Sequence, residues 1–250
     1  MSGKSEFSKQ AADYAKYRPI YPSELYPYLK SVAPANDLAY DAGTGNGQCA
    51  VALANHFKAV VASDLSREQI ANAKPKANVT YTVSDAHESG IEARSVDLIT
   101  AATAIHWFNF DLFYAECHRI LKDGGVIAAW SYGWHQCEDP KITDLIQKIG
   151  KVILKDHWSP QPKLIWDNYS KIPFPFKEFS PPAFHQSLSW DMNELIGYLT
   201  TWSATQKYID DKGTHPVDVV RQELAAAWGS PERKLQFDCP LIMRIGRHSV

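Results

Sequence analysis

Residues 38–48, Leu-Ala-Tyr-Asp-Ala-Gly-Thr-Gly-Asn-Gly-Gln, constrain the fold more than any other part of the chain. A short apolar run ends at Asp41, and the residues from Cys49 to Phe57 that follow have a helical pattern. Between them lie three glycines at alternate positions, Gly43, Gly45 and Gly47. This order predicts a strand, a tight turn and a helix, with a turn that lets a ligand contact the backbone.

A second acidic residue supports a nucleoside-binding role for this turn. Asp64 ends the next apolar run, residues 59–63, about 20 residues after the glycines. A carboxylate at the end of the second strand commonly binds the two hydroxyls of a ribose. The two acidic residues and the glycine turn therefore predict one binding site at the carboxyl ends of the first strands.

The pattern of strands and helices continues beyond this unit and predicts an α/β fold. Expected strands lie at 38–41, 59–63, 78–83, 96–102 and 126–132, with helices between them. Such alternation favours a parallel sheet with helices on both faces. Two later strands, at 184–190 and 240–247, are expected to form a closing antiparallel pair.

We expect four regions along the chain. Residues 1–34 form an arm and a helix that close over the site, and residues 35–137 form the binding core. Residues 138–182, which are rich in proline and aromatic side chains, form an inserted cap. Residues 183–250 complete the core with the closing antiparallel strands.

Charge and cysteine content exclude several classes of partner. The chain has 26 basic and 28 acidic residues among 250, so no net field attracts it to nucleic acid or to an anionic membrane. No apolar run approaches the roughly 20 residues needed to span a bilayer, and no secretion signal is evident. The four cysteines form no Cys-x-x-Cys pair, which favours reduced thiols. We expect a cytoplasmic protein without a metal site, either a monomer or a homodimer.

The segment Asp41-Ala-Gly-Thr-Gly-Asn-Gly47 resembles the first motif of the class I S-adenosylmethionine-dependent methyltransferases. Later motifs of that family correspond to Asp64, to Ser84-Asp85-Ala86 and to the Lys122-Asp-Gly-Gly125 turn. The resemblance covers residues 35–132 and implies a Rossmann-like, seven-stranded, mostly parallel sheet with an antiparallel last strand. The segments 17–22 and 104–108 resemble more narrowly the subgroup that contains trans-aconitate methyltransferases and related small-molecule carboxyl methyltransferases.

The resemblance also implies roles in cofactor binding. Asp41 would meet the ammonium end of S-adenosylmethionine, Asp64 would accept hydrogen bonds from both ribose hydroxyls, and Leu65 would pack on the adenine. Asp85 and the Ala86 amide would read the adenine edge. The full set of expected cofactor-binding residues is Tyr14, Arg18, Asp41, Gly43, Thr44, Gly45, Gln48, Asp64, Leu65, Asp85, Ala86, Ala102 and His106.

The methyl acceptor is expected to be a small molecule, with a carboxylate oxygen as the acceptor atom. The residues expected to bind it are Tyr17, Trp107, Trp134 and His135. A carboxylate needs no general base, whereas a phenol, thiol or amine would make His106 the candidate base. Tyr17 and Arg18 are further catalytic candidates, because the arm that carries them can fold over the bound ligand. The alternative is that this arm packs on the outside of the sheet.

Two other functions remain open at this stage. A non-catalytic sensor would bind S-adenosylmethionine without releasing S-adenosylhomocysteine. A nicotinamide-dependent oxidoreductase would use the same acidic residue after its second strand, although the Gly-x-Gly-x-Gly spacing departs from the dinucleotide pattern Gly-x-Gly-x-x-Gly. Methylation of nucleic acid or protein is disfavoured by the absence of a basic patch and of an Asn-Pro-Pro-Tyr-type motif after the fourth strand.

Overall fold

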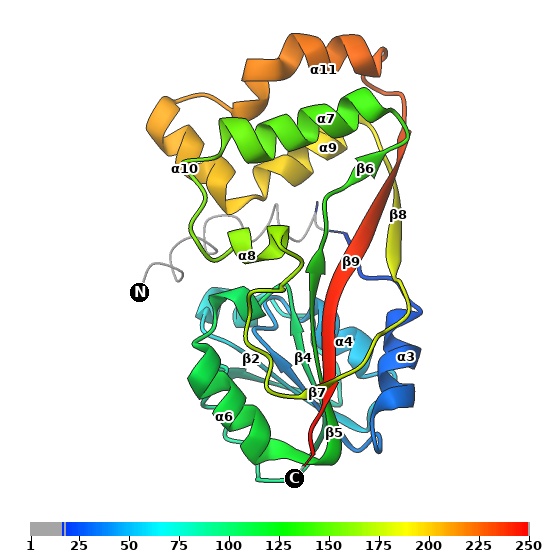
Figure 1. The fold of residues 1–250 in the computed structure, drawn as a ribbon, viewed down its shortest axis with the longest axis vertical. Helices are drawn as coiled ribbons and strands as arrows, with labels where there is room; N and C mark the ends of the chain where they lie inside the picture. Colours follow the sequence, from blue (N-terminus) through cyan, green and yellow to red (C-terminus); the bar gives the residue numbers. More distant parts are fainter. Residues whose placement is uncertain (1–16, 18, 250) are drawn as a thin grey trace.

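A computed structural model describes residue 17 and residues 19–249, and its central feature is a mixed sheet (Figure 1). The five parallel strands lie in the order β3-β2-β1-β4-β5, which reverses between β1 and β4. Their bounds are β1 Leu38–Ala42, β2 Ala59–Asp64, β3 Val79–Val83, β4 Val96–Ala102 and β5 Leu121–Tyr132. Ligands of open α/β sheets bind outside the carboxyl ends of the strands at such a reversal.

Helices cover both faces of this sheet because its strands alternate apolar side chains between the two sides. On one face, Ala39 and Leu98 pack in a core with α3 (Leu25–Val32) and α4 (Gln48–Leu53). On the other, Tyr40 and Ile99 pack with α6 (Phe110–Ile120). A short helix, α5 (Arg67–Ala71), connects β2 to β3, and Ser66 caps its first turn. The expected α/β fold with covered faces is confirmed.

The long strand β9 (Leu235–Arg247) changes the expected strand count. It pairs antiparallel with β5 over residues 241–247, which confirms an antiparallel last strand. Its other partners are the short strands β6 (Gln136–Cys137), β7 (Lys177–Glu178) and β8 (His185–Trp190). The part of the sheet that the structure describes therefore has nine strands, and the expected seven is wrong. The two additional strands are β6 and β7, which pair with β9 at residues 237–238 and 246–247, whereas β8 corresponds to the strand expected at 184–190 and pairs antiparallel with β9 as expected.

A layer of helices lies beyond the carboxyl ends of the parallel strands (Figure 1). It contains α7 (Pro140–Lys148), η2 (Ile149–Ile153), α9 (Met192–Thr200), α10 (Ser203–Lys212), η3 (Pro216–Val220) and α11 (Arg221–Trp228). These elements share one apolar core that also includes Trp190 and Phe237. The short helix α8 (Lys163–Trp166) lies between this layer and the sheet. We call all of these elements together, α8 included, the helical layer.

The helical layer draws on two separate stretches of sequence. Helix α9 begins at Asp191, whose carboxylate accepts from the Glu194 amide in a capping box, and its apolar side packs in the same core as α7. The division at residues 182 and 183 separates helices that pack together in space, so the four predicted regions remain a prediction about sequence organisation.

Three further expectations concern membrane-spanning helices, the cysteines and the N-terminal arm. No helix within residues 17–249 combines the length and apolar character required to cross a bilayer. All four cysteines are buried free thiols, as expected. Most of the N-terminal arm, including Tyr14 and Arg18, lies outside the described residues, so its expected closure over the site stays a prediction.

Candidate active site

The glycine turn between β1 and α4 has the backbone conformation that the sequence predicts. Gly43, Gly45 and Gly47 all have positive φ, at 68°, 57° and 81°. A Cβ atom at Gly43 would lie 2.7 Å from that of Ala104. The turn is fixed to the next strand, since the Thr44 amide donates to the Ser63 carbonyl at 2.9 Å. It is therefore a rigid, side-chain-free surface at the carboxyl end of β1.

Asp41 supports this turn from below. Its side chain is fully buried, and its two carboxylate oxygens accept hydrogen bonds from the hydroxyls of Thr44 at 2.5 Å and Thr100 at 2.7 Å. Burial raises the pKa of the Asp41 carboxyl, although both hydroxyl contacts act to lower it. In this structure Asp41 holds the turn in place, and its expected contact with the ammonium of the cofactor stays a prediction.

Asp64 lies beside the turn, at the end of β2. One of its oxygens accepts from the Gly45 amide at 2.8 Å and the other from the Ser66 amide at 2.8 Å. Burial raises the pKa of the Asp64 carboxyl, and the two backbone contacts partly offset that effect. The carboxylate is thus held in one orientation, and each oxygen keeps a second lone pair for a ligand hydroxyl.

The next strand ends provide a place for a flat apolar group. Leu65 is 46% exposed after the end of β2, and Val83 is 44% exposed at the end of the edge strand β3. Asp85 lies beside them, with its carboxylate 2.6 Å from Nδ1 of His87. The buried Ala86 is fixed through its carbonyl, which accepts from the hydroxyl of Tyr40 at 3.1 Å.

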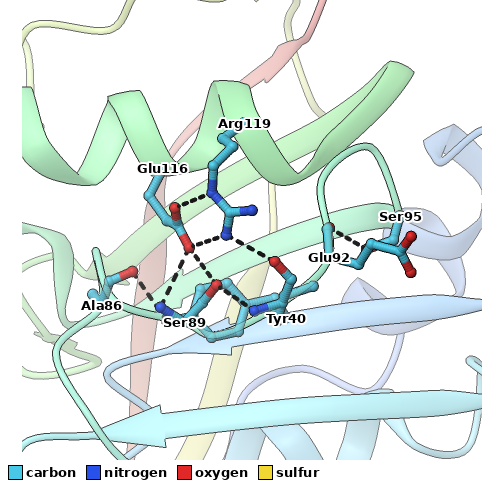
Figure 2. Close-up of polar contacts among 8 residues, drawn as sticks. Tyr40, Ala86, Ser89, Glu92, Ser95, Glu116 and Arg119 are labelled. Atoms are coloured by element: carbon cyan, nitrogen blue, oxygen red, sulfur yellow. Dashed lines mark hydrogen bonds and ion pairs between the residues drawn. The ribbon is translucent and has the colours of Figure 1, made fainter.

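Residues 85–91 form a loop after β3, and an ion pair on α6 holds the far end of this loop (Figure 2). Glu116 lies between Arg119, whose Nε donates to it at 2.7 Å, and Ser89, whose hydroxyl also contacts it. Arg119 donates in addition to the Ile91 carbonyl at 2.8 Å. Burial acts to raise the pKa of Glu116, but the contacts from Arg119 and Ser89 outweigh it and keep the pKa below its usual value. The loop 85–91 is therefore attached to the core at both ends.

The substitution Glu116→Gln is expected to lower the free energy of unfolding at neutral pH by about 1–2 kcal/mol. This figure is the value of a charge-assisted hydrogen bond, reduced because the guanidinium of Arg119 is half-exposed and water screens the pair. Because the folded pKa lies below the unfolded one, this contribution is complete above the unfolded pKa and is lost as pH falls through the folded pKa. Thermal unfolding across pH 3–7 should show the two proteins converging on acidification. Glu223→Gln, at an exposed pair with Lys148, is the control, and an equal loss there would contradict the prediction.

The end of β4 carries a strained residue at the middle of the site. Thr103 has a φ of 54°, which is a rare conformation for a β-branched residue and is often associated with function. Its amide donates to the Trp130 carbonyl at 2.6 Å and its hydroxyl contacts that of Tyr21 at 2.9 Å. These contacts hold the half-buried Ala102 and the Thr103 backbone at the point where strands β1 and β4 diverge.

His106 follows in the short helix η1 (Ile105–Trp107) and is 4% exposed. Its Nδ1 lies 2.9 Å from the hydroxyl of the buried Tyr169. Tyr169 itself has a φ of 59°, and Arg244 holds that backbone by donating to the Tyr169 and Ile172 carbonyls at 3.0 and 2.6 Å. The orientation of the imidazole is thus set by a residue 63 positions away.

A cavity of about 110 Å³ lies between these strand ends and the helical layer. Four of the predicted residues line it, namely His106, Trp107, Trp134 and His135. Tyr17 lies outside its lining, and the ring of Tyr17 is packed against Gly197 of α9. Gln48 binds the Pro19 carbonyl through its side-chain amide at 3.3 Å. The structure therefore brings the predicted acceptor residues together, except for Tyr17.

Sequence reasoning missed several residues of the site. Thr100 was detectable in principle, because it is a polar residue within the apolar strand 96–102. Tyr40, Glu116 and Tyr169 gave no signal, since the contacts that connect them to the site, with Ala86, Ser89 and His106, join residues 27 to 63 positions apart in the chain. The cavity also takes in three tryptophans that were not predicted to bind the acceptor, Trp158, Trp166 and Trp202.

The chain is similar to known methyltransferases along most of its length. Residues 40–129 match the family model described as a methyltransferase domain. A Dictyostelium discoideum protein named as a methyltransferase is 33% identical over 226 residues, which cover 89% of this chain and 86% of that protein. A structure titled as a type II methyltransferase of Anaeromyxobacter dehalogenans has a TM-score of 0.86 and 38% identity, and covers 92% of this chain and 98% of that one.

A more distant structure shares only the fold. The Haemonchus contortus phosphoethanolamine N-methyltransferase 2, solved with S-adenosylhomocysteine and phosphomonomethylethanolamine, has a TM-score of 0.51 and 17% identity. The match covers 99% of this chain and 61% of that one.

Proposed function

We propose that this chain, which belongs to the class I S-adenosylmethionine-dependent methyltransferases, methylates a carboxylate oxygen of a small molecule bound in the cavity below the helical layer. One observation carries the proposal. The glycine turn with Asp64 and the cavity lined by His106 and the strained Thr103 lie at the same end of the sheet, because all of these residues follow the carboxyl ends of neighbouring parallel strands. A cofactor on the turn would therefore have its reactive end directed at the cavity.

The residues on the turn fit S-adenosylmethionine. Asp64 would accept from the ribose hydroxyls, and the exposed Leu65 and Val83 would be covered by the adenine. Both Asp41 and Asp64 have carboxyls whose pKa is raised, in each case by burial, and each would gain from a nearby cation. The cofactor supplies a methyl group on a positively charged sulfur, which leaves as a neutral thioether.

The lining of the cavity suits an anionic acceptor. None of the described residues that line it is acidic, so no side chain among them repels a carboxylate. Hydroxyl and imidazole groups, which are polar and carry no negative charge, also line the cavity, on Thr103, His106, Ser131, His135, Thr201 and Ser203. A carboxylate oxygen would form the new bond to carbon as the carbon–sulfur bond breaks, and no proton is transferred. Arg18, which lies outside the described residues, remains a candidate partner of the carboxylate.

The first test of this proposal is release of S-adenosylhomocysteine from S-adenosylmethionine with a panel of small carboxylic acids. We expect release that depends on the acid and gives its methyl ester. Binding of S-adenosylmethionine with no release for any acceptor would instead support the sensor. Binding of NAD in a parallel calorimetric titration would support the oxidoreductase.

The role of His106 separates a carboxylate from acceptors that must lose a proton. The substitution His106→Asn keeps an amide near the Tyr169 hydroxyl but removes Nε2, our candidate for the acceptor contact. For a carboxylate we expect the KM for the acceptor to rise about tenfold, the value of one hydrogen bond, while kcat changes by less than about fivefold. If turnover instead fell by about two orders of magnitude, with a shifted pH profile, His106 would be a general base and a carboxylate acceptor would be excluded.

A further inference from the structure

The cavity is walled by an arrangement of four indole rings. Trp134 contacts Trp166 and Trp202, and Trp158 contacts the same two, so the four rings form a closed circuit. The ring centroids in these pairs are 5.9, 5.9, 6.0 and 5.6 Å apart. The planes meet at 48° for two pairs and 85° for the other two. We call these four residues the indole box.

The indole box depends on one small residue of the helical layer. Gly150 lies in the π-helical segment η2, and a Cβ atom there would be 2.6 Å from the Trp134 ring and 3.2 Å from that of Trp202. Its carbonyl accepts a hydrogen bond from Nε1 of Trp158 at 2.7 Å. Three of the four indoles are therefore placed by a single glycine. A π-helical turn of this kind is uncommon and often marks a functional site.

The indoles are not simply filling a core. Trp134, Trp158 and Trp166 are each only half-buried, and all four line the cavity together with Trp107. The volume of about 110 Å³ is about three quarters of that of an apolar cavity that binds benzene, about 150 Å³, so the cavity limits an inserted group to a single ring. Aromatic rings favour tilted and edge-to-face contacts with other rings, so walls at 48° and 85° offer an inserted ring both kinds.

The charges around the indole box disfavour a cationic occupant. Nζ of Lys151 lies 4.9 Å from the centroid of the Trp134 ring and already supplies a positive charge to that ring. No described residue in the lining is acidic, so nothing there would neutralise a bound ammonium group.

We propose that the indole box binds a planar aromatic ring, so that the acceptor is a single-ring aromatic carboxylic acid. This proposal rests on the proposed function, because it assigns the body of the molecule whose carboxylate is methylated. The ring would lie in the cavity against the indoles that line it, and its carboxylate would point toward Thr103 and His106, which follow β4.

A matched pair of acids tests the proposal. Benzoate and cyclohexanecarboxylate carry the same carboxylate on six-membered rings, of which only the first is planar and aromatic. In calorimetric titrations with S-adenosylhomocysteine present, we expect benzoate to bind about fivefold or more tightly than cyclohexanecarboxylate. Equal binding of the two, or displacement of benzoate by tetramethylammonium, would overturn the proposal.

Variants test whether the preference for benzoate depends on the indole box. Gly150→Ala should abolish the preference for benzoate while leaving S-adenosylhomocysteine binding intact. Val152→Ala, at an exposed position of the same segment, should keep the preference. If Gly150→Ala does not fold, Trp166→Leu on α8 replaces it, with the same expected loss. A preference that survives in the folded variant would also overturn the proposal.

Assays of methyl transfer distinguish failure of the aromatic acceptor from failure of the proposed carboxylate methylation. Ester formation from cyclohexanecarboxylate as efficient as from benzoate would leave the proposed function standing and overturn the aromatic acceptor. Tight binding of benzoate and of phenol, with methylation of phenol alone, would support the indole box and refute the carboxylate.

Discussion

Asp64→Ala is expected to weaken S-adenosylmethionine binding by about 100-fold or more. The carboxylate is oriented by the Gly45 and Ser66 amides. Its loss would remove the two charge-assisted hydrogen bonds that we propose it accepts from the ribose hydroxyls, together worth about 3 kcal/mol. Isothermal titration calorimetry with S-adenosylmethionine measures the effect directly. The affinity of the wild type should also fall on acidification, because protonation of Asp64 removes the charged acceptor, and this dependence should be weaker in the variant.

The control for this prediction is Asp37→Ala. Asp37 is also a carboxylate, paired with Lys58 and Lys122, but it precedes β1 at the opposite end of the sheet. We expect its removal to leave the affinity for S-adenosylmethionine unchanged. Equal losses in the two variants would mean that net charge, and not contact with the ribose, governs binding.

Gly43→Ala should both destabilise the protein and abolish cofactor binding. The positive φ of 68° costs an alanine about 1–2 kcal/mol, and the contact of its Cβ with Ala104 at 2.7 Å adds about 1–3 kcal/mol of overpacking. Any shift that relieves the contact moves the turn on which the cofactor would lie. Urea unfolding and calorimetry together measure the two effects.

Gly213→Ala isolates the conformational part of that cost. Gly213 ends α10 with a φ of 70°, and a Cβ atom there meets nothing within 4 Å. We expect a loss of about 1–2 kcal/mol in the free energy of unfolding, with normal S-adenosylmethionine binding. If Gly43→Ala bound the cofactor as well as Gly213→Ala does, the glycine turn would not be the cofactor site.

Local patterns predicted the sheet and the cofactor side of the site. Asp41, the three glycines and Asp64 are adjacent to strands whose apolar runs are unmistakable, so their place at the carboxyl ends follows from the parallel order of the strands. The strand expected at 184–190 was an equally local signal, and it corresponds to β8. What these residues share is that their neighbours in sequence are their neighbours in space.

The acceptor side could be predicted only in part. His106, Trp107, Trp134 and His135 follow β4 and β5 directly, and the strand ends locate them. The indole box and the contact between Tyr169 and His106 could not be foreseen, because they join loops and turns far apart in the chain whose packing no local pattern specifies. The seven-strand expectation failed for a similar reason, since the edge of β9 recruits short segments with little strand pattern of their own.

Strand β9 has a mechanical consequence. It is hydrogen-bonded to β5 over residues 241–247 and to β8 over residues 235–240. The helical layer is thereby fastened to the sheet along one continuous ribbon (Figure 1). Swinging that layer away as a rigid lid would break backbone hydrogen bonds on this side. We therefore expect the acceptor and the product to enter and leave on the side away from β9, through movements of side chains and loops, while β9 holds the helical layer in place.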